Sequence, residues 1–376
     1  MNRLVIIGNG FDLAHGLKTS YMDFINWYWE QRLCTFINNL TSISEDKLCS
    51  MIIKNEEMRS WSCFYSSCCR KHPITKERQF TLQEIIDGIR EDKENFSFKC
   101  SPFFDSILKS IETKGWVDIE NDYYRCLKKA MNNSQCGYTI QELNEQLYSL
   151  QTKLVEYLNT IDKNAFNKNL HDKMIELFDP KDFSQEGKQK AYKSIGYYFE
   201  DIQEISNPET LKKYIPQSIM LLSFNYTETA KHYGNFNLTH NYIHGELSRE
   251  KEIIFGYGDE LDKDYKELLD MNDNELLKFA KNVKYLETSH YRKMLNFINA
   301  GPFQVFIMGH SCGNSDRTLL NTVFEHENCV SIKPFYYKKA NGADNYLELV
   351  QNISRNFTDM KLFRDRVVNK EQCLSM

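Results

Sequence analysis

The sequence predicts an α/β protein, with a Rossmann-like, doubly wound parallel sheet and a large helical insertion. Short apolar segments with the pattern of buried strands occur near both ends of the 376-residue chain. Helical patterns separate the strands of the second group, and such alternation favours parallel pairing. We therefore expect residues 1–24 and 216–345 to form one α/β domain, residues 25–215 a mainly helical insertion, and residues 346–376 a C-terminal helix and tail.

The first strand signal covers residues 4–7, which are apolar and rich in β-branched side chains. Gly8, Asn9 and Gly10 follow as a tight turn, and a helix is expected from Leu13 onward. A strand, a glycine turn and a helix N-terminus present unpaired amides and a positive dipole end, which suit a phosphate group. These glycines do not have the usual dinucleotide spacing, so a purely structural turn remains the alternative.

An acidic pair and a long amphipathic helix stand out in the predicted insertion. Asp118 and Glu120 fit either an acid/base pair or the first turn of a helix, where acidic residues are favoured. Thr139 and Glu142 form a capping box. The helix that follows has apolar residues three and four positions apart, as in a coiled coil: Ile140, Leu143, Leu147, Leu150, Leu154, Tyr157 and Ile161. This seam fits packing against another helix of the chain or against a second subunit.

The net charge, the apolar runs and the cysteines limit the class of protein to which this chain can belong. The net charge of −5 gives no reason to expect nonspecific nucleic-acid binding. No apolar run approaches the roughly 18 residues of a membrane span, and the N-terminal pattern is not that of a signal peptide. The 11 cysteines are scattered. Those at residues 34–69, with His72, lack the CxxC pairs of a zinc site, so we expect free thiols and no metal. We therefore expect a soluble cytoplasmic protein with no membrane partner.

Strand signals resume after residue 216. Apolar segments with strand character lie at 219–224, 242–243, 253–258, 303–308 and 330–337. Helices are expected over 264–300, ending before a Gly-Pro pair, and from the end of the segment 309–316 to about residue 326.

Three polar clusters, at residues 8–12, 223–227 and 309–316, follow directly on apolar strands. The carboxyl ends of parallel strands meet at the ligand-binding edge of an open sheet, so we expect these clusters to converge there. His244, after a short strand, is a fourth candidate. Taken singly, such residues also fit a core histidine, a turn asparagine or a helix cap. Their shared position at strand ends favours a site.

Five segments resemble the AbiH family of bacterial phage abortive-infection proteins: GNGFDLAHGLKTSYMDF, WVDIE, SFNYT, IHGEL and GHSCGNSD. The same segments are more distantly similar to sirtuin-like NAD-binding domains of bacterial defence proteins. In those domains a glycine-rich turn is followed by an asparagine and then a histidine, which Asn225 and His244 match here. The resemblance implies a sirtuin-like nucleotide-binding domain, and an antiphage effector with NAD as its substrate.

The reaction that the resemblance implies is hydrolysis of the nicotinamide–ribose bond of NAD or of a related nucleotide. Neutral His244 accepts a proton, Asn225 orients the ribose or the attacking water without adding charge, and Asp12 places a carboxylate near the phosphates. The residues expected to bind the nucleotide are the turn residues Gly8, Asn9, Gly10 and Phe11, and, on the second ribose or adenine side, Gly309, Ser311 and Asp316.

The chain departs from sirtuins in ways that favour hydrolysis over protein deacylation. Asp12 stands where a small hydroxyl residue is usual, Thr227 replaces an aspartate, and the four-cysteine zinc module is missing. Two alternatives remain: a nucleotide-sensing regulatory module without turnover, and a metal-dependent nuclease that uses Asp12, Asp118, Glu120 and Asp316. A homo-oligomer or a regulatory defence partner is expected to restrain the effector in healthy cells.

Overall fold

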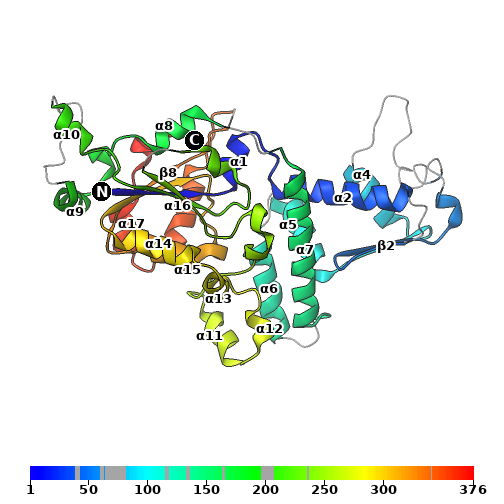
Figure 1. Cartoon of the computed structure of the whole chain (residues 1–376). Coiled ribbons are helices and arrows are strands. Elements are labelled where there is room, and N and C mark those ends of the chain that lie inside the picture. Colours follow the sequence, from blue (N-terminus) through cyan, green and yellow to red (C-terminus); the bar gives the residue numbers. More distant parts are fainter. Residues whose placement is uncertain are drawn as a thin grey trace. The chain divides into compact units, whose positions relative to one another are not determined.

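The computed structural model describes residues 1–38, 43–59, 63, 82–114, 118–132, 136–162, 166–195, 207–234, 237–339 and 341–376. This part of the chain forms two compact units (Figure 1): Met1–Thr19 joined with Ile161–Met376, and Ser20–Thr160. None of the helices in the described ranges has the length and apolar character that crossing a membrane requires.

A five-stranded parallel sheet forms the centre of the first unit and confirms the predicted fold class. Its strands are β1 (Asn2–Ile7), β5 (Ile219–Ser223), β6 (Leu238–Tyr242), β7 (Phe303–Met308) and β8 (Cys329–Phe335). They pair in the order β6-β5-β1-β7-β8, and all four pairings are parallel. Numbered along the chain, this order is 3-2-1-4-5, as in a doubly wound Rossmann sheet, and the switch point lies between β1 and β7.

Helices surround this sheet. Those before β6 are α1 (Asn9–Ala14), α8 (Lys168–Met174), η2 (Pro180–Asp182), α9 (Gln185–Ile195), α10 (Pro208–Lys212) and η4 (Thr229–His232). Between β6 and β7 lie η5 (Leu247–Glu252), α11 (Lys263–Asp270), α12 (Asn274–Leu277), α13 (Lys281–Lys284), η6 (Tyr285–Glu287) and α14 (His290–Asn299). The last are η7 (Asn314–Asp316), α15 (Arg317–Phe324), α16 (Tyr346–Arg355), α17 (Met360–Arg366) and η8 (Lys370–Gln372).

Both faces of β1 are buried, which explains its continuous apolar run. Alternate side chains of a strand point to opposite faces. Leu4 and Ile6 lie in a core cluster with apolar residues of α14, α15 and α16. Val5 and Ile7 lie in a second cluster with residues of α1, α8 and η4. The helices therefore cover the sheet on two sides, as a doubly wound fold requires.

The second unit covers residues 20–160, whereas the predicted insertion covers residues 25–215. The difference arises because the segment that follows Ile161 packs on the parallel sheet of the first unit. In α8, Leu170 and Met174 join the cluster that holds Val5 and Ile7. Farther along the chain, Phe178, Phe183, Ala191 and Tyr214 form a third cluster with Met1 and Val330. The helical pattern of residues 161–215 predicts helices but does not indicate the surface that each helix covers.

Two predicted elements of the first unit were wrong. Residues 253–258 do not form a strand: Tyr257 makes an isolated bridge with Ala280, and the Lys281 amide donates to the Tyr257 carbonyl, so this segment pairs with the chain before α13. The helix expected from Leu13 begins at Asn9 instead, directly after β1. The glycine turn is thus the first turn of α1.

The second unit combines helices with a three-stranded antiparallel sheet that the sequence did not predict. Its strands pair in the order β2-β3-β4. The elements are α2 (Tyr21–Asn38), β2 (Ile43–Glu45), β3 (Cys49–Ile53), η1 (Glu56–Arg59), α4 (Leu82–Glu91), β4 (Phe96–Cys100), α5 (Pro102–Lys114), α6 (Ile119–Asn132) and α7 (Ile140–Thr160). These strands are short and lie between strong helical patterns, so they gave little strand signal.

The long helix α7 has the predicted start and the predicted seam. Its capping box is present, because the Glu142 amide donates to Thr139 Oγ1 over 3.1 Å and the Thr139 amide donates to Glu142 Oε2 over 2.8 Å. Leu143, Leu147 and Leu150 on the seam are fully buried. Helix α7 contacts α2, α5 and α6. The apolar seam therefore packs within the chain itself.

Some sequence features fall outside the described residues. These are Cys68, Cys69 and His72 of the rejected zinc pattern, Trp116 and Val117 of the WVDIE segment, and residues 196–206, where a helical pattern that starts at about residue 188 continues.

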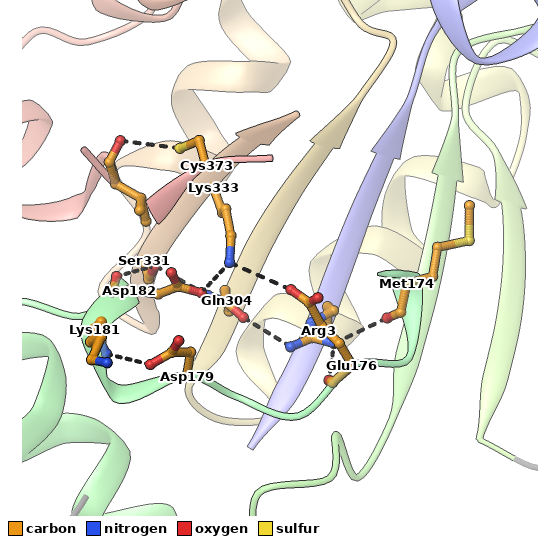
Figure 2. Close-up of polar contacts among 11 residues, drawn as sticks. Arg3, Met174, Glu176, Asp179, Lys181, Asp182, Gln304, Ser331, Lys333 and Cys373 are labelled. Carbon is orange, nitrogen blue, oxygen red and sulfur yellow. Dashed lines mark hydrogen bonds and ion pairs between the residues drawn. The ribbon is translucent and has the colours of Figure 1, made fainter. Parts of the chain in front are cut away.

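A buried network of charged side chains lies on one face of the sheet (Figure 2). Lys333 Nζ donates to Asp182 Oδ2 over 3.0 Å, and Gln304 Nε2 donates to the same oxygen over 3.2 Å. Arg3 donates to Gln304 Oε1 over 3.1 Å and to the Glu176 carbonyl over 2.6 Å. Because Arg3, Gln304 and Lys333 come from neighbouring strands, the network fixes the chain segment 174–182 against the sheet.

Replacing Lys333 with methionine should lower the free energy of unfolding by about 3–5 kcal/mol, because the buried Asp182 carboxylate loses its cation. Urea unfolding followed by circular dichroism measures this. Lys168→Met is the matched control: it removes an exposed pair with Asp172 and should cost less than about 0.5 kcal/mol. Adding Asp182→Asn to Lys333→Met should restore part of the loss. If Lys333→Met and Lys168→Met lost the same free energy of unfolding, the buried ion pair of Lys333 and Asp182 would contribute no more to stability than an exposed pair.

Candidate functional site

The connections after β1 and β7 touch each other at the switch point of the sheet. The Gly8 amide donates to the Met308 carbonyl over 3.2 Å, and the Gly10 amide donates to the Gly309 carbonyl over 2.8 Å. A Cβ atom at Gly8 would lie 2.5 Å from His310 Cα, and one at Gly309 would lie 2.1 Å from the Phe11 nitrogen. Glycine is therefore required at these positions by the close approach of two backbones.

The phosphate site expected at the turn depends on amides that are free to bind a ligand, and these backbone contacts use most of them. The Gly8 amide donates to the carbonyl group of Met308, the last residue of β7, and the Gly10 amide donates to that of Gly309. The Phe11 amide donates to the Gly8 carbonyl over 2.9 Å. Three of the four amides from Gly8 to Phe11 are thus used within the chain. Asn9 is exposed, and its Oδ1 accepts a hydrogen bond from Thr19. The turn packs two connections together and does not offer a cradle of amides.

Asp12 and Asn225 lie together beside this turn. The Asn225 Nδ2 donates to the Gly8 carbonyl over 3.0 Å, which ties the connection after β5 to the one after β1. Asp12 is 1% exposed, and its Oδ2 accepts a hydrogen bond from Thr227 Oγ1. Within the described parts of the chain, its Oδ1 has no hydrogen-bond partner. Burial raises the pKa of Asp12, although hydrogen bonds from Thr227, Thr229 and Asn225 act in the opposite direction.

His244 and Asp316 form a second cluster, with a lysine that the sequence analysis did not identify. His244 Nε2 lies 3.2 Å from Asp316 Oδ1, and Lys281 Nζ lies 2.7 Å from the same oxygen. Lys281 is fully buried, and His244 and Asp316 are 4% and 8% exposed. The Tyr285 hydroxyl lies 3.1 Å from His244 Nε2, and its ring is parallel to the imidazole.

The connection after β7 adds His310 to this cluster. Its Nδ1 accepts a hydrogen bond from the Cys312 amide over 3.0 Å, so the ring proton is on Nε2, which lies 3.5 Å from Asp316 Oδ2. Asp316 thus receives contacts from Lys281, His244 and His310. The Phe224 ring contacts both imidazoles, with centroid distances of 5.0 Å to His244 and 4.2 Å to His310.

These contacts set the protonation states. Burial alone would raise the pKa of Asp316, but Lys281 and His244 hold it well below its usual range, so the carboxyl group is ionised. Burial and then the charge of Lys281 lower the pKa of His244 to about 4, against the opposing effect of Asp316. His244 is therefore neutral at pH 7, with Nε2–H directed at the carboxylate. Nδ1 then carries the lone pair and is the atom able to accept a proton.

The last part of the chain holds the connection after β7 in place. Asn352 of α16 donates to the Ser311 carbonyl over 2.9 Å, and Asn356, just after α16, donates to the Cys312 carbonyl over 2.9 Å. Cys312 has a positive φ of 54°, a left-handed conformation that residues other than glycine seldom adopt. Ser311 itself is exposed.

The structure thus brings most of the predicted site residues to one edge of the sheet, in two groups. Gly8, Gly10, Phe11, Asp12, Asn225 and Gly309 form the first. His244 and Asp316 lie in the second, which also contains His310, Lys281 and Tyr285. His310 was visible in the GHSCGNSD segment. Lys281 and Tyr285 follow no strand and carry no motif, so their position at the site depends on how the chain between β6 and β7 folds.

Two of the four acidic residues of the nuclease alternative, Asp118 and Glu120, belong to the second unit. In the second unit, Asp118 caps helix α6, with its Oδ1 accepting from the Asn121 amide over 3.0 Å. Glu120 is buried in the first turn of the same helix. Among the described residues, no three His, Cys, Asp or Glu side chains are arranged as a metal-binding group.

Comparison with known protein families identifies one match. A family model described as bacteriophage abortive infection AbiH covers residues 4–337. The chain belongs to the AbiH family. Comparisons with curated proteins and with solved structures gave no match. The matched region covers the second unit, most of the first unit and every site residue predicted from the sequence. AbiH proteins take part in bacteriophage abortive infection.

Gly309→Ala should destabilise the first unit by more than about 2 kcal/mol, because a side chain there combines a positive φ with a backbone clash. Gly16→Ala is the matched control: Gly16 has nearly the same φ, 77° against 75°, but nothing within 4 Å of its Cβ position, so only the conformational cost of about 1 kcal/mol remains. Thermal unfolding compares the two. Equal losses would show that the contact between the two connections is not tight.

Stability should fall as the pH falls from about 6.5 to about 4, in part because of His244. In this window the unfolded chain binds a proton at residue 244, whereas the folded protein, whose His244 pKa is about 4, does not. The free energy of unfolding therefore rises with pH through the window, by up to about 3 kcal/mol. Denaturant unfolding at a series of pH values measures the slope. His244→Gln should flatten it, and His232→Gln, at an exposed position, should not.

Proposed function

We propose that this AbiH protein is an abortive-infection effector that hydrolyses NAD, or a related nucleotide, at the carboxyl edge of its parallel sheet. The observation that carries the proposal is the buried pair of His244 and Asp316, with 3.2 Å between Nε2 and Oδ1. This contact supports a site in which the imidazole of His244 is neutral and the carboxylate of Asp316 holds it in one tautomer. The pair lies at the edge of the sheet where open α/β folds bind nucleotides.

The proposed reaction replaces the bond between the nicotinamide nitrogen and C1′ of the ribose with a bond from C1′ to a water oxygen. Nicotinamide leaves with the electron pair of the broken bond and becomes neutral, and the water loses a proton. His244 Nδ1 accepts this proton, from the water or through a ribose hydroxyl. Asp316 stabilises the imidazolium through its contact with Nε2, the role that the buried carboxylate has in a catalytic triad.

The low pKa of His244 makes the imidazole a weak base before substrate binds. The nucleotide itself changes this, because negative phosphate charge close to the ring favours the protonated form and raises the pKa. The base thus becomes effective when the substrate is present. Lys281 supports this arrangement by keeping Asp316 ionised, so we assign it as a positioning residue.

Asn225 and Asp12 act from the other half of the site. Asn225 is half-buried, and its amide can orient the ribose or the water without adding charge. Asp12 is a positioning residue in this proposal, because it lies under Thr227 and beside Asn225, with almost no surface of its own. Exposed Asn9 and Ser311 contribute the contacts to the phosphates and the adenosine, in place of the amides that are used within the chain.

The test is an incubation of the purified protein with NAD, with nicotinamide and ADP-ribose resolved by liquid chromatography. We expect product from the wild type, a loss of at least about 100-fold in His244→Gln, as for removal of a general base, and a similar loss in Asn225→Ala. His232→Gln is the matched control and should keep wild-type turnover. Circular dichroism of each variant separates loss of function from loss of folding, since Asn225 also binds the Gly8 carbonyl.

Because an effector must be restrained in uninfected cells, NAD should also be measured in bacteria that express the protein, before and after phage infection. We propose that a second copy of the chain or a regulatory defence partner supplies the restraint. Constant NAD during a successful defence would contradict the proposed hydrolysis. Tight nucleotide binding without product would favour the sensing module, and nucleic-acid cleavage that requires a divalent metal would favour the nuclease.

A further inference from the structure

Two cysteines face each other across the small antiparallel sheet of the second unit. Cys49, the first residue of β3, is the direct partner of Cys100, the last residue of β4. The Ser101 amide donates to the Leu48 carbonyl over 2.8 Å, so the adjoining pair Leu48 and Ser101 is a hydrogen-bonded one. Since the two kinds of pair alternate along an antiparallel ladder, Cys49 and Cys100 form a non-hydrogen-bonded pair.

This position in the ladder decides whether the two sulfur atoms can be joined. In a non-hydrogen-bonded pair the Cα atoms are about 4.5 Å apart and the side chains lie on the same face of the sheet at their closest. Disulfides span Cα distances of about 4.4–6.8 Å. The register therefore places both thiols within bonding range, with no movement of the backbone required. Both are free thiols in the structure.

The two thiols have different surroundings. Cys49 is 2% exposed, whereas Cys100 is half-buried. The Cys49 thiol donates a hydrogen bond to the Cys100 sulfur, which lowers the pKa of Cys100, and Arg90 acts in the same direction, against burial and Asp105. The same contact and burial raise the pKa of Cys49. Cys100 is thus the thiol that is both more accessible and more easily ionised, and a thiolate is the reactive form.

We propose that Cys49 and Cys100 are a reversible redox modification site, at which a low-molecular-weight disulfide oxidises the two thiols to a cross-strand disulfide. The Cys100 thiolate attacks one sulfur of the oxidant, forms a mixed disulfide and releases one small thiolate. Cys49 then loses its proton to solvent and attacks Cys100 Sγ, which releases the second small thiol. The protein dithiol is oxidised by two electrons, and the oxidant is reduced to two thiols.

The product ties the start of β3 to the end of β4. These residues are far apart in the sequence, and the disulfide adds a covalent link to the hydrogen-bonded ladder between the two strands. Reduction by a dithiol restores the free pair. Disulfides of this kind in a reducing compartment are typically transient and redox-sensing, so the modification would report the oxidation state of the cell to the second unit.

Peptide mapping tests the proposal directly. Folded wild-type protein is incubated with oxidised glutathione, free thiols are blocked by alkylation, and the chain is digested with trypsin without reduction. Cleavage after lysine separates residues 48–54 from residues 100–109, each with a single cysteine. We expect these two peptides to be joined, with a loss of two free thiols for each chain, and to separate after reduction with dithiothreitol.

Two variants test the order of the steps. Cys49→Ser should stop at the mixed disulfide and carry one glutathione on Cys100. Cys100→Ser should carry none on Cys49. Cys63→Ser removes another half-buried thiol of the same unit and should leave the linked peptides unchanged. Glutathione on Cys49 in Cys100→Ser would overturn the assigned order. Wild-type protein that keeps both thiols, or links either one to another cysteine, would overturn the site itself.

Discussion

The direct contact between the connections after β1 and β7 is the constraint on which the candidate site depends. Two backbones meet there without a side chain between them, and Gly8, Gly10 and Gly309 permit the approach. The contact lies at the switch point of the sheet, the place where other doubly wound proteins leave a crevice for a ligand. In this protein the same place is filled by the chain itself. The polar residues that follow each strand are therefore held beside the contact, and not above an open turn.

Two of the buried charge clusters in the described part of the first unit have different effects. The network of Arg3, Asp182, Gln304 and Lys333 pairs its charges and connects strands to the segment 174–182. At the strand ends, Asp316 receives Lys281, His244 and His310, so three groups compete for one carboxylate. The first arrangement stabilises a fixed packing. The second leaves a buried histidine neutral, with its tautomer defined by the contact with the carboxylate.

The sequence predicted those features that depend on local pattern. The buried strand at residues 4–7 and the capping box at Thr139 were readable because apolar runs and caps act over a few residues. The parallel sheet followed from strands alternating with helices. The expected strand at 253–258 was wrong. An apolar run with a glycine also occurs in an irregular segment, and this one makes only an isolated bridge with the chain before α13. The helix start was misplaced because glycine does not exclude the first turn of a helix.

The candidate site was predictable to the extent that its residues follow strands. Four polar residues follow strands, and the order of the strands brings them to one edge of the sheet: Asp12, Asn225, His244 and Asp316. Lys281 comes from a short helix in a long connection, and nothing local indicates that its ammonium group is buried against Asp316. The use of the glycine amides was likewise invisible, because their partners are carbonyl groups some 300 residues away, a separation set by the sheet order.

The two asparagines near the C-terminus extend the site beyond the region that defines the family. The AbiH match ends at residue 337, yet Asn352 and Asn356 donate to the carbonyl groups of Ser311 and Cys312. A protein shortened to the matched region would keep every proposed catalytic group and lose the support of the loop that presents His310 and Asp316. The family boundary is therefore too narrow for choosing a fragment that keeps this loop in place, and α16 counts as part of the framework of the candidate site.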